Sequence, residues 1–415
     1  MRLRTTHARR LGWGSTVVKL AMAHRTLTVL LAAIITMELV RGVEEIALLP
    51  LFLTEVHGEG TGLAGLTITA YLAADVAVRA PAGWLADRFG RKRMLLLGLA
   101  LSLIPLPFML RARHTGVLLL LNAVLGVGAG TAWPAVYAAV ADTYGAGRRG
   151  LIMGILNTAM LGGLASGPIV GNVLVDRLGF TATFVVCMGL MAGAIVLVAA
   201  LMQETRGERT WAHSWEATWR GIGLLWRGEL LVLALIAVAM TLGMTTILPV
   251  LNLFGLHVLG LTLTELALLM LVPAGVAAVA LVVLGHAADR YGRKPLLVVG
   301  MAAMAVPFLL SPISTNPLVV MAGATVAGLG YAAAVPAWSA LLMDRVTAQS
   351  DHHGLLFGGV SSVQGLGLTL GPTLGGVLWQ YVGPYAPLIA VGTIFAAGCI
   401  LATFTRDTIT VSPRQ

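Results

Sequence analysis

The chain has 415 residues, of which 58% are hydrophobic and only 11% charged, and its formal net charge is +9. An ordinary soluble domain carries about 25% charged residues, so this composition excludes a soluble globule and predicts an integral membrane protein surrounded by lipid. The positive charge collects in short segments between apolar runs, which is a topology signal rather than a patch for RNA or DNA, and we expect no nucleic-acid partner.

The chain opens with a basic segment, residues 1–26, that lacks the small-residue cleavage site of a signal peptide. Apolar stretches of the roughly 20 residues that cross a bilayer follow it. Runs rich in Leu, Ala and Gly favour helices over a β-barrel. We predict twelve spans: 27–53, 62–86, 94–110, 117–140, 151–175, 180–202, 230–254, 263–288, 295–313, 317–343, 355–380 and 385–404.

These spans divide the chain into five predicted regions: a cytoplasmic tail (1–26), a six-helix bundle (27–202), a cytoplasmic linker (203–229), a second six-helix bundle (230–404) and a short tail (405–415). With twelve spans, 22 of the 27 Lys and Arg residues share one side of the membrane. The positive-inside rule then puts both termini in the cytoplasm.

The linker and the cysteines add two smaller features. The linker carries Trp211, Trp215, Trp219 and Trp226, a spacing typical of a helix lying in the membrane interface, although an ordered linker explains it as well. Cys187 and Cys399 each fall within a predicted span. We interpret them as small buried residues, without a disulfide framework.

The first two spans carry ionisable residues at mid-membrane depth, where they are costly and indicate function. At about 100° per residue, Glu38, Arg41 and Glu45 share one face of span 1, and Asp75 and Arg79 lie one turn apart in span 2. Glu38 and Asp75 both lie about 17 Å from the inner ends of their helices, so they can meet. The alternative is an ion-pair network that only joins spans 1 and 2.

The second half of the chain lacks these charges. At an offset of 202 residues, Asp75 maps to Ala277 and Arg79 to Leu281. Confinement to one half favours function over structure. We predict proton-coupled antiport, in which Arg41 pairs alternately with Glu38 and Asp75 and a substrate competes for the carboxylate. Protons are then the coupling ion. We expect no cofactor, no metal site and no enzyme activity, because the sequence has neither a GxxxxGK[ST] loop nor an HExxH motif.

Several segments repeat at nearly the same offset. "GWLADRFGRKRM" starts at Gly83 and "GHAADRYGRKPL" at Gly285, while "GVGAGTAWPA" starts at Gly126 and "GLGYAAAVPA" at Gly328. "GGLASGPIVGN", from Gly162, has its counterpart in "LGLTLGPTLGG". Six spans per copy is an even number, so the two halves have the same orientation in the membrane, as in rocking secondary transporters.

These motifs resemble the major facilitator superfamily over essentially the whole chain. The loop signature between spans 2 and 3, with its companions, matches at Gly83, Asp87, Arg88, Gly90, Arg91 and Asp142, and again at Gly285, Asp289, Arg290, Gly292, Arg293 and Asp344. A Gly-Pro packing pattern similar to that of the family's exporters matches at Gly163, Gly167, Pro168 and Gly171, and again at Gly367, Gly371, Pro372 and Gly375.

The resemblance implies an all-α membrane fold of twelve transmembrane helices in two pseudo-symmetric six-helix bundles. It also implies a cytoplasmic gate in which Asp87 and Asp289 dock against helix N-termini of the opposite half, span 11 in the case of Asp87. The alternative for these loops is positive-inside charge alone, which explains Arg88 but not the acid in both copies. Drug:proton exporters of this family usually have Arg at the position of Asn122, so Arg41 or Arg79 would have to replace it.

The expected cavity has one charged wall, with Trp133 and Tyr137 beside the charges, and one apolar wall. The apolar wall would hold Met240, Met244, Leu281, Tyr331, Trp338 and Gln364. Such a cavity suits an amphipathic molecule. We therefore expect proton-coupled export of amphipathic or lipophilic molecules by a monomer, in a prokaryotic cytoplasmic membrane.

Other functions stay open. The Glu38-x-x-Arg41 pair with Asp75 is similar to the pattern of glycolipid-anchor flippases in the same superfamily, so flipping of a glycolipid or lysophospholipid is the first alternative. Nutrient uptake is a further one, which the exporter-type Gly-Pro pattern disfavours. A receptor or scaffold without transport would need a soluble domain larger than these tails.

Overall fold

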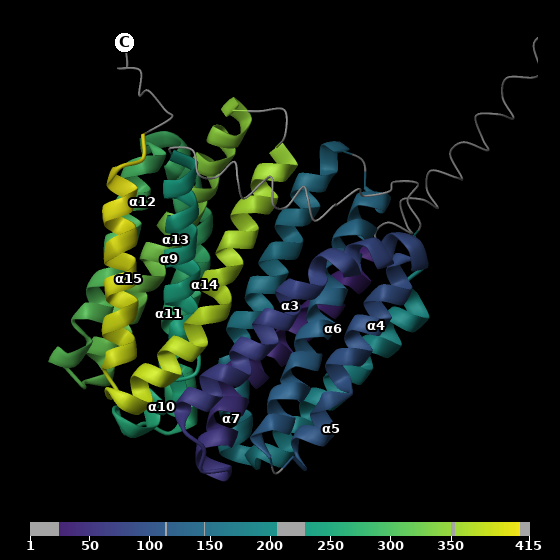
Figure 1. Cartoon of the computed structure of the whole chain (residues 1–415), viewed down its shortest axis with the longest axis horizontal. Coiled ribbons are helices and arrows are strands. Elements are labelled where there is room, and N and C mark those ends of the chain that lie inside the picture. Colours follow the sequence, from purple (N-terminus) through teal and green to yellow (C-terminus); the bar gives the residue numbers. More distant parts are fainter. Residues whose placement is uncertain (1–24, 113, 145, 206–228, 350–352, 407–415) are drawn as a thin grey trace, which may run out of the picture.

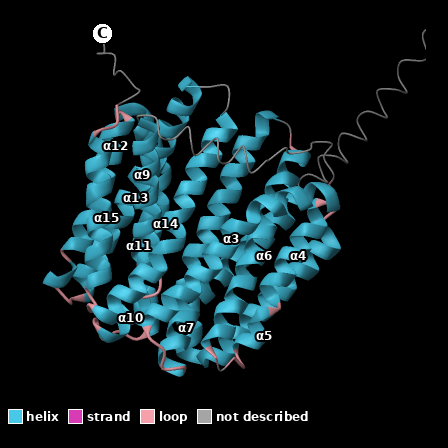
Figure 2. Ribbon diagram, in the orientation of Figure 1, coloured by secondary structure: helices cyan, strands magenta, loops and turns pink. Residues whose placement is uncertain are grey.

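The computed structural model describes residues 25–112, 114–144, 146–205, 229–349 and 353–406 (Figure 1). Within these ranges the chain is helical, with short turns and no strand (Figure 2). This confirms the all-α fold that the long apolar runs predict, because a helix satisfies its backbone hydrogen bonds without water. The four linker tryptophans and most of both predicted tails lie outside the described residues.

The first half of the chain begins with one helix, Arg25–Val56, whose hydrogen bonding changes along its length. It passes from α-helix into the π-helix η1 (Val43–Leu48), then through α2 (Leu49–Leu51) into a second π-helix, η2 (Phe52–Val56). The remaining helices are α3 (Thr61–Phe89), α4 (Arg91–Leu103), α5 (Pro105–Met109), α6 (Thr115–Thr143) and α7 (Ala146–Leu201).

The second half starts with α9 (Glu229–Thr246), and the chain then turns through a segment containing Pro249 before α10 (Leu251–His257). The predicted continuous span 230–254 is therefore broken near its end, as a proline without an N–H donor favours. The other elements are α11 (Leu263–Tyr291), α12 (Arg293–Leu309), η3 (Ser311–Ile313), α13 (Pro317–Gln349), α14 (His353–Tyr381) and α15 (Ala386–Thr403).

Ten helices in the described part of the chain are long and apolar enough to cross a membrane. The one spanning Ile152–Leu201 is 50 residues long, about 75 Å at 1.5 Å per residue, which is far more than a bilayer needs. Its helical geometry breaks at Gly179, where φ is 79°. The break falls between the predicted spans 151–175 and 180–202.

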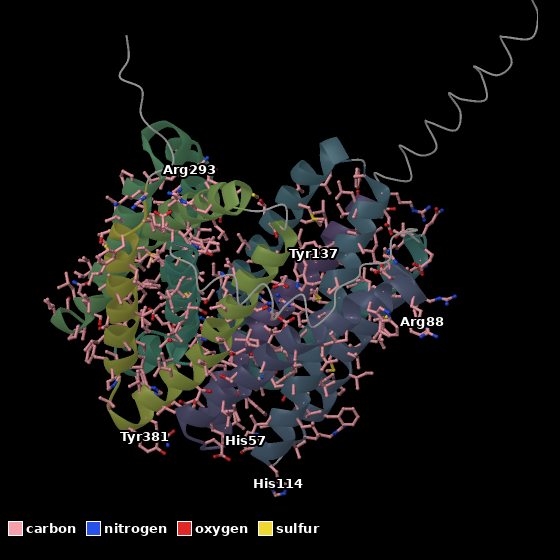
Figure 3. The ribbon with its side chains drawn as sticks, turned by 45° about the horizontal axis from the view of Figure 1, so that its top comes forward. His57, Arg88, His114, Tyr137, Arg293 and Tyr381 are labelled. Carbon is pink, nitrogen blue, oxygen red and sulfur yellow. The ribbon has the colours of Figure 1, made fainter. Side chains whose placement is uncertain are left out.

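The turns between helices lie at two opposite ends of the molecule. We call the end with the Gly90 and Gly292 turns the basic end, and the end with turns 57–60 and 382–385 the far end. Figure 3 labels Arg293 at the opposite end from His57, His114 and Tyr381. Gly90 (φ 101°) and Gly292 (φ 99°) each form a one-residue connection between two helices, a conformation that other residues rarely adopt.

Buried hydrophobic side chains form two separate clusters. One comes from residues 29–202, together with Leu253 and Leu263. The other comes from residues 230–402. Figure 1 shows α14 and α3 next to each other between these two groups of helices, and α3 packs on α14 as α7 packs on α11. Each half of the sequence thus has its own hydrophobic core, and the halves meet along a few helices.

Candidate functional site

The first helix buries an ion pair near its middle. Arg41 Nη2 lies 3.0 Å from Glu38 Oε2, one turn away. Trp133 of α6 donates its Nε1–H to Glu38 Oε1 at 3.1 Å. Glu38 is fully buried, whereas the Arg41 side chain is 19% exposed. The carboxylate is thus held by one cation and one neutral donor, which offsets part of the cost of burying it.

A second ion pair lies on α3. Arg79 donates two hydrogen bonds to Asp75, from Nε to Oδ1 at 2.9 Å and from Nη2 to Oδ2 at 2.7 Å. The Asp75 side chain is 1% exposed and that of Arg79 46%. Asp75 is therefore paired with Arg79 in this conformation, and Arg41 with Glu38. The alternation of Arg41 between Glu38 and Asp75 stays a prediction, which now requires Asp75 to leave Arg79.

The two ion pairs are close enough to influence each other. Arg41 interacts electrostatically with Asp75 and with the Tyr71 hydroxyl, and Glu38 with Asp75 and Arg79. Tyr71 is buried and lies one turn before Asp75 on α3. Tyr71 was not among the residues predicted from the sequence, although its i, i+4 spacing to Asp75 places it on the same helix face.

Glycines of α6 let these groups approach. A Cβ atom on Gly126 would collide with the Tyr71 carbonyl oxygen, and one on Gly130 with the Asp75 carbonyl oxygen. The α6 backbone therefore lies directly against α3 at the level of the charges. The "GVGAG" segment is a close-packing surface, which is how small residues commonly act between membrane helices.

Glu45 lies one turn beyond Arg41, inside the π-helix η1, and is 5% exposed. Neither of its carboxyl oxygens has a hydrogen-bond partner. Asn122 of α6 interacts with it. Asn122 is fully buried and donates Nδ2–H to the Thr67 carbonyl at 2.8 Å, while its own Oδ1 also lacks a partner.

Glu44, the neighbour of Glu45, is also 5% exposed. A helical wheel at 100° per residue separates these two side chains and places Glu44 off the face that Glu38, Arg41 and Glu45 share. The π-helix changes that geometry, because its i→i+5 hydrogen bonds widen the turn. Both glutamates are buried, but they have different neighbours: Cys187 of α7 interacts with Glu44, whereas Arg41 and Asn122 interact with Glu45.

The aromatic residues of the predicted charged wall stack. Trp133 is buried and its ring centroid lies 5.3 Å from that of Tyr137, which is 38% exposed. Figure 3 labels Tyr137 between the two groups of helices. Trp133 thus connects the buried Glu38 to a partly exposed phenol, and Tyr137 is the more accessible of the two to a substrate.

The predicted apolar wall is only partly exposed. Met244 is 42% exposed, whereas Met240 is 5% exposed and belongs to the core of the second half. Trp338 donates Nε1–H to the Leu233 carbonyl at 2.9 Å. Gln364 is half-buried, and its backbone carbonyl accepts from Thr241 at 3.1 Å. Of these four residues, Met244 offers the most apolar contact surface.

An apolar groove of about 540 Å³ lies between α11 and α13. Its lining is made of small and aliphatic side chains: Gly275, Val276, Val279, Ala280, Val283, Leu284 and Leu329. Leu281, which the repeat aligns with Arg79, lies in the same stretch of α11. The second half therefore presents hydrocarbon where the first half holds charge.

The loop signature in the first half is built around Arg91, which is 1% exposed. Arg91 pairs with Asp87 at 2.7 Å and with Asp142 at 2.8 Å, and it donates to the Ala86 carbonyl at 2.8 Å. Arg88 is exposed over Trp84 and Phe89. Residues 350–352, before the helix against which Asp87 is predicted to dock, lie outside the described part of the chain.

The second copy repeats this arrangement in part. Arg293 pairs with Asp344 and also donates to the Ala340 carbonyl at 3.2 Å. Gly285, Asp289 and Arg290 belong to α11, but their side chains are not among the described ones. The docking of Asp289 is therefore still a prediction.

The Gly-Pro pattern of α7 lies against the first helix. A Cβ on Gly167 would collide with Gly42 Cα, one on Gly163 would meet the Ile35 carbonyl at 2.8 Å, and one on Gly171 the Ala47 Cβ at 2.7 Å. Gly367, Gly371 and Gly375 of α14 lie equally close to α9. Pro168 and Pro372 are inside these helices. Both copies thus bring two backbones into direct contact.

The two halves are joined toward the far end. Asn172 and Asn252 form a reciprocal amide pair at 3.1 and 2.7 Å, both fully buried or nearly so. Asn252 also donates to the carbonyls of Ile46 and Ala47 in η1, at 3.2 and 3.3 Å. Neither Asn172 nor Asn252 was among the site residues predicted from the sequence.

Helices α3 and α14 make further contacts between the halves. Thr61 donates to the Gly376 carbonyl at 2.9 Å, and the Gly62 N–H donates to Gln380 at 2.9 Å. Deeper in the molecule, the Thr69 and Thr373 hydroxyls lie 2.8 Å apart. These contacts cover the far portion of both helices, from their ends to about one third of their length.

Long apolar helices, two repeated cores and, among the residues whose side chains are described, buried charges in the first core only indicate an integral membrane protein of the transporter class. The family comparison agrees. The model of the Major Facilitator Superfamily matches residues 30–277 and 233–414, and the chain belongs to that family. Its family and relatives are transporters, so the chain is grouped with transport proteins rather than enzymes.

Relatives extend over most of the chain. It is 26% identical over 360 residues to multidrug resistance protein 2 of Bacillus subtilis, covering 85% of this chain and 88% of the relative. It is 23% identical over 367 residues to the proton-coupled antiporter flippase LtaA of Staphylococcus saprophyticus, covering 86% and 88%. Among solved structures, the nucleoside transporter NupG matches with a TM-score of 0.73 at 14% identity, over 91% of this chain and 98% of NupG.

Proposed function

We propose that this protein is a proton-coupled transporter that exports amphipathic small molecules by alternating access. The observation that carries the proposal is the buried cluster of two ion pairs, Glu38–Arg41 and Asp75–Arg79, in one half only. A buried ion pair adds little to stability, because the cost of removing the charges from water offsets their mutual attraction. Two such pairs near the middle of membrane helices therefore indicate a role in moving ions or substrate.

The membrane topology follows from the same residues. We propose twelve spans in two bundles of six, since the break at Gly179 divides α7 in two and α14 has 29 residues, enough to cross a bilayer. The basic end would face the cytoplasm, together with both termini. Bacterial relatives support a cytoplasmic membrane location, and we propose a monomer with no cofactor besides the proton.

Alternating access is supported by where the halves touch. The described hydrogen bonds between them lie toward the far end, and we propose that this conformation is closed outward and accessible from the cytoplasm. In the opposite conformation the loop signatures would close the basic end, with Asp87 and Asp289 docking on the other half. Arg91 and Arg293 would keep those loops folded in both states.

Substrate class follows from the contrast between halves. The first half offers Asp75 and the exposed Arg79 and Tyr137, and the second offers Met244 and the apolar groove of α11 and α13. A lipophilic cation is complementary to both halves. Its charge can displace Arg79 from Asp75, while its hydrocarbon part covers the apolar surface. The similarity to a multidrug resistance protein supports this choice.

The test uses purified protein in liposomes with an imposed pH gradient, followed with a lipophilic cationic dye. We expect wild-type protein to move the dye when a gradient is present, and Asp75→Asn and Glu38→Gln to lose roughly 10-fold or more of that transport. Glu59→Gln is the control, because Glu59 lies just after the first helix, outside the buried cluster, and its partner Thr115 belongs to the same half. If both cluster variants equal wild type, the cluster is structural and the coupling proposal is wrong.

Lipid flipping is the second candidate. It is favoured by the similarity to a proton-coupled antiporter flippase over 86% of the chain and by the charges of the first half. A fluorescent glycolipid, added to the same liposomes as a second probe, separates the two functions. Movement of the glycolipid but not the dye would identify a flippase, with the same dependence on Asp75 and Glu38.

A further inference from the structure

One carboxyl group of the cluster is left without a partner. Glu38 has Arg41 and Trp133, and Asp75 has Arg79. Glu45 is also buried, at 5% exposed, yet neither of its oxygens accepts a hydrogen bond. At the neighbouring Glu44 only Oε1 is buried without a partner, and Arg41 and Asn122 act on Glu45 rather than on Glu44. An ionised carboxylate in that position would be costly, whereas a carboxylic acid needs only one acceptor for its O–H.

Asn122 supplies that acceptor. Its amide nitrogen is fixed by the Thr67 carbonyl, 2.8 Å away, because a carbonyl oxygen can only accept. The amide oxygen is buried without a donor, and one N–H of the same amide is also left over. Asn122 can therefore accept from the Glu45 acid through Oδ1 or donate to the Glu45 carboxylate through that N–H, and the two side chains interact.

The surroundings of Glu45 contain one cation that could replace the proton. Arg41 lies one turn before Glu45 and acts on it electrostatically, but in this conformation Arg41 is engaged with Glu38 at 3.0 Å. The other titratable groups acting with Glu45 are Glu44, on the same helix, and Tyr71, on α3. Neither can neutralise a carboxylate, so the charge of Glu45 depends on which acid Arg41 contacts.

We propose that Glu45 binds the transported proton, donating to Asn122 Oδ1 when loaded and pairing with Arg41 when empty. The proposal rests on the proton-coupled transport proposed above. On unloading, the Glu45 O–H bond breaks, the proton passes to water, and the Arg41 guanidinium turns from Glu38 to the new carboxylate. Glu38 then lacks its cation, and a cationic substrate bound at Asp75 compensates both carboxylates, which interact with each other. Proton and substrate therefore occupy the cluster in turn.

The position of Glu45 links this exchange to the gate. Glu45 lies in η1, and the next two carbonyls, of Ile46 and Ala47, accept hydrogen bonds from Asn252 of the other half. Opening the far end separates Asn252 from η1. The π-helical turn that carries the proton site would therefore lose its anchor in the conformation that admits protons from outside.

The experiment measures three quantities on the full chain: dye transport into liposomes driven by a pH gradient, dye-for-dye exchange without a gradient, and proton release when the dye binds to detergent-solubilised protein. In Glu45→Gln the amide still donates to Asn122, so the variant should fold and resemble the loaded state. We expect gradient-driven transport and proton release to fall roughly 10-fold or more, with exchange kept within about 2-fold.

Two further variants make the result specific. Asn122→Leu removes the acceptor and keeps the branched shape of the side chain, and it should reduce proton release while exchange continues. Glu44→Gln is the matched control, an adjacent buried glutamate that should keep all three quantities. Proton release unchanged in Glu45→Gln would overturn the assignment of Glu45 while leaving proton-coupled transport intact. A wild-type protein whose transport ignores the pH gradient would instead overturn the proposed function itself.

Discussion

Two buried charged residues, Arg91 and Glu45, show how differently this chain treats burial. Arg91 has two carboxylates and a carbonyl as partners, whereas the Glu45 carboxyl oxygens accept no hydrogen bond. A fully satisfied buried charge is consistent with a structural role, because its contacts fix one local geometry. An unpaired buried carboxylate has an unfavourable desolvation free energy, which binding a proton or a cation removes. This behaviour is expected of a coupling residue.

Arg91→Ala should destabilise the protein, and this prediction belongs to the residue scale. The substitution removes the cation that neutralises Asp87 and Asp142, at a cost of about 3 kcal/mol. Thermal unfolding of the purified protein in detergent measures it. Arg88→Ala is the control, since Arg88 is exposed over two aromatic rings and its loss should change stability by less than about 1 kcal/mol. Equal melting temperatures for both variants would contradict the buried pairing.

The residues of the charged cluster could be identified from the sequence, but their pairing could not. Spacing of three and four residues marks which side chains can meet, and it places both Glu38–Arg41 and Asp75–Arg79 within reach. It gives no preference between those pairs and a pair formed across helices. That choice depends on depth, rotamers and the approach of α6 to α3, which only the packed structure defines.

Helix geometry could be predicted where the sequence carries a local marker such as glycine, and not elsewhere. The turns at Gly90 and Gly292 follow from a glycine between charged residues and apolar runs, and both have positive φ. The π-helix over Val43–Leu48 has no such marker. A wheel drawn at 100° per residue separates Glu44 from Glu45, in agreement with their different neighbours, Cys187 and Asn122. It gives no sign of the hydrogen bond from Asn252 to Ile46, 206 residues away.

At the scale of elements, contact between α3 and α6 depends on glycine. A Cβ on Gly130 would collide with the Asp75 carbonyl, so Gly130→Ala must push the two helices apart. We expect a loss of about 1–3 kcal/mol from this overpacking and reduced transport, because Asp75 moves with its helix. Melting temperature and dye transport measure the two effects.

Gly154→Ala is the appropriate comparison for that variant. Gly154 is also a helical glycine, but nothing lies within 4 Å of the position that a Cβ atom would take there. Alanine at this site should therefore be neutral or stabilise the helix by up to about 1 kcal/mol. A Gly130→Ala protein as stable and active as Gly154→Ala would show that α3 and α6 are not in the close contact described.

The whole molecule combines a symmetric frame with asymmetric chemistry. Lys92 donates to the Ala199 carbonyl at 2.6 Å, and Lys294, 202 residues later, donates to the Thr403 carbonyl at 2.7 Å. The Arg91–Asp142 pair likewise has its counterpart in Arg293–Asp344. The 202-residue repeat in the sequence predicts these matching contacts in the two halves. The buried charges break the symmetry, which is why they are the candidates for function.

Contacts between the halves could not be predicted in the same way. Asn172, Asn252, Thr69 and Thr373 are isolated polar residues in apolar helices, and each could equally have bonded within its own helix, as Thr commonly does. Which of them meet depends on how one half is rotated against the other. That rotation is a property of the conformation, so these contacts should break and re-form during transport.

A reversible cross-link tests this at the scale of the molecule. The Thr69 and Thr373 hydroxyls are 2.8 Å apart. Cysteines at these two positions therefore need only a small helix movement to bring their Cβ atoms to the separation of about 3.5–4.5 Å found in disulfides. In a background with Cys187→Ala and Cys399→Ala, the double variant Thr69→Cys/Thr373→Cys should transport dye when reduced. Oxidation should stop transport, because it holds the far end shut, and a reductant should restore it.

The single variants Thr69→Cys and Thr373→Cys separate locking from damage, since neither can bridge the halves and both should transport under oxidising and reducing conditions alike. The cross-linked protein should still bind dye from the basic end, because only the far end is tied. Full transport by a protein shown to be cross-linked would mean that α3 and α14 stay together throughout the cycle, and the far end would then not be the outward gate.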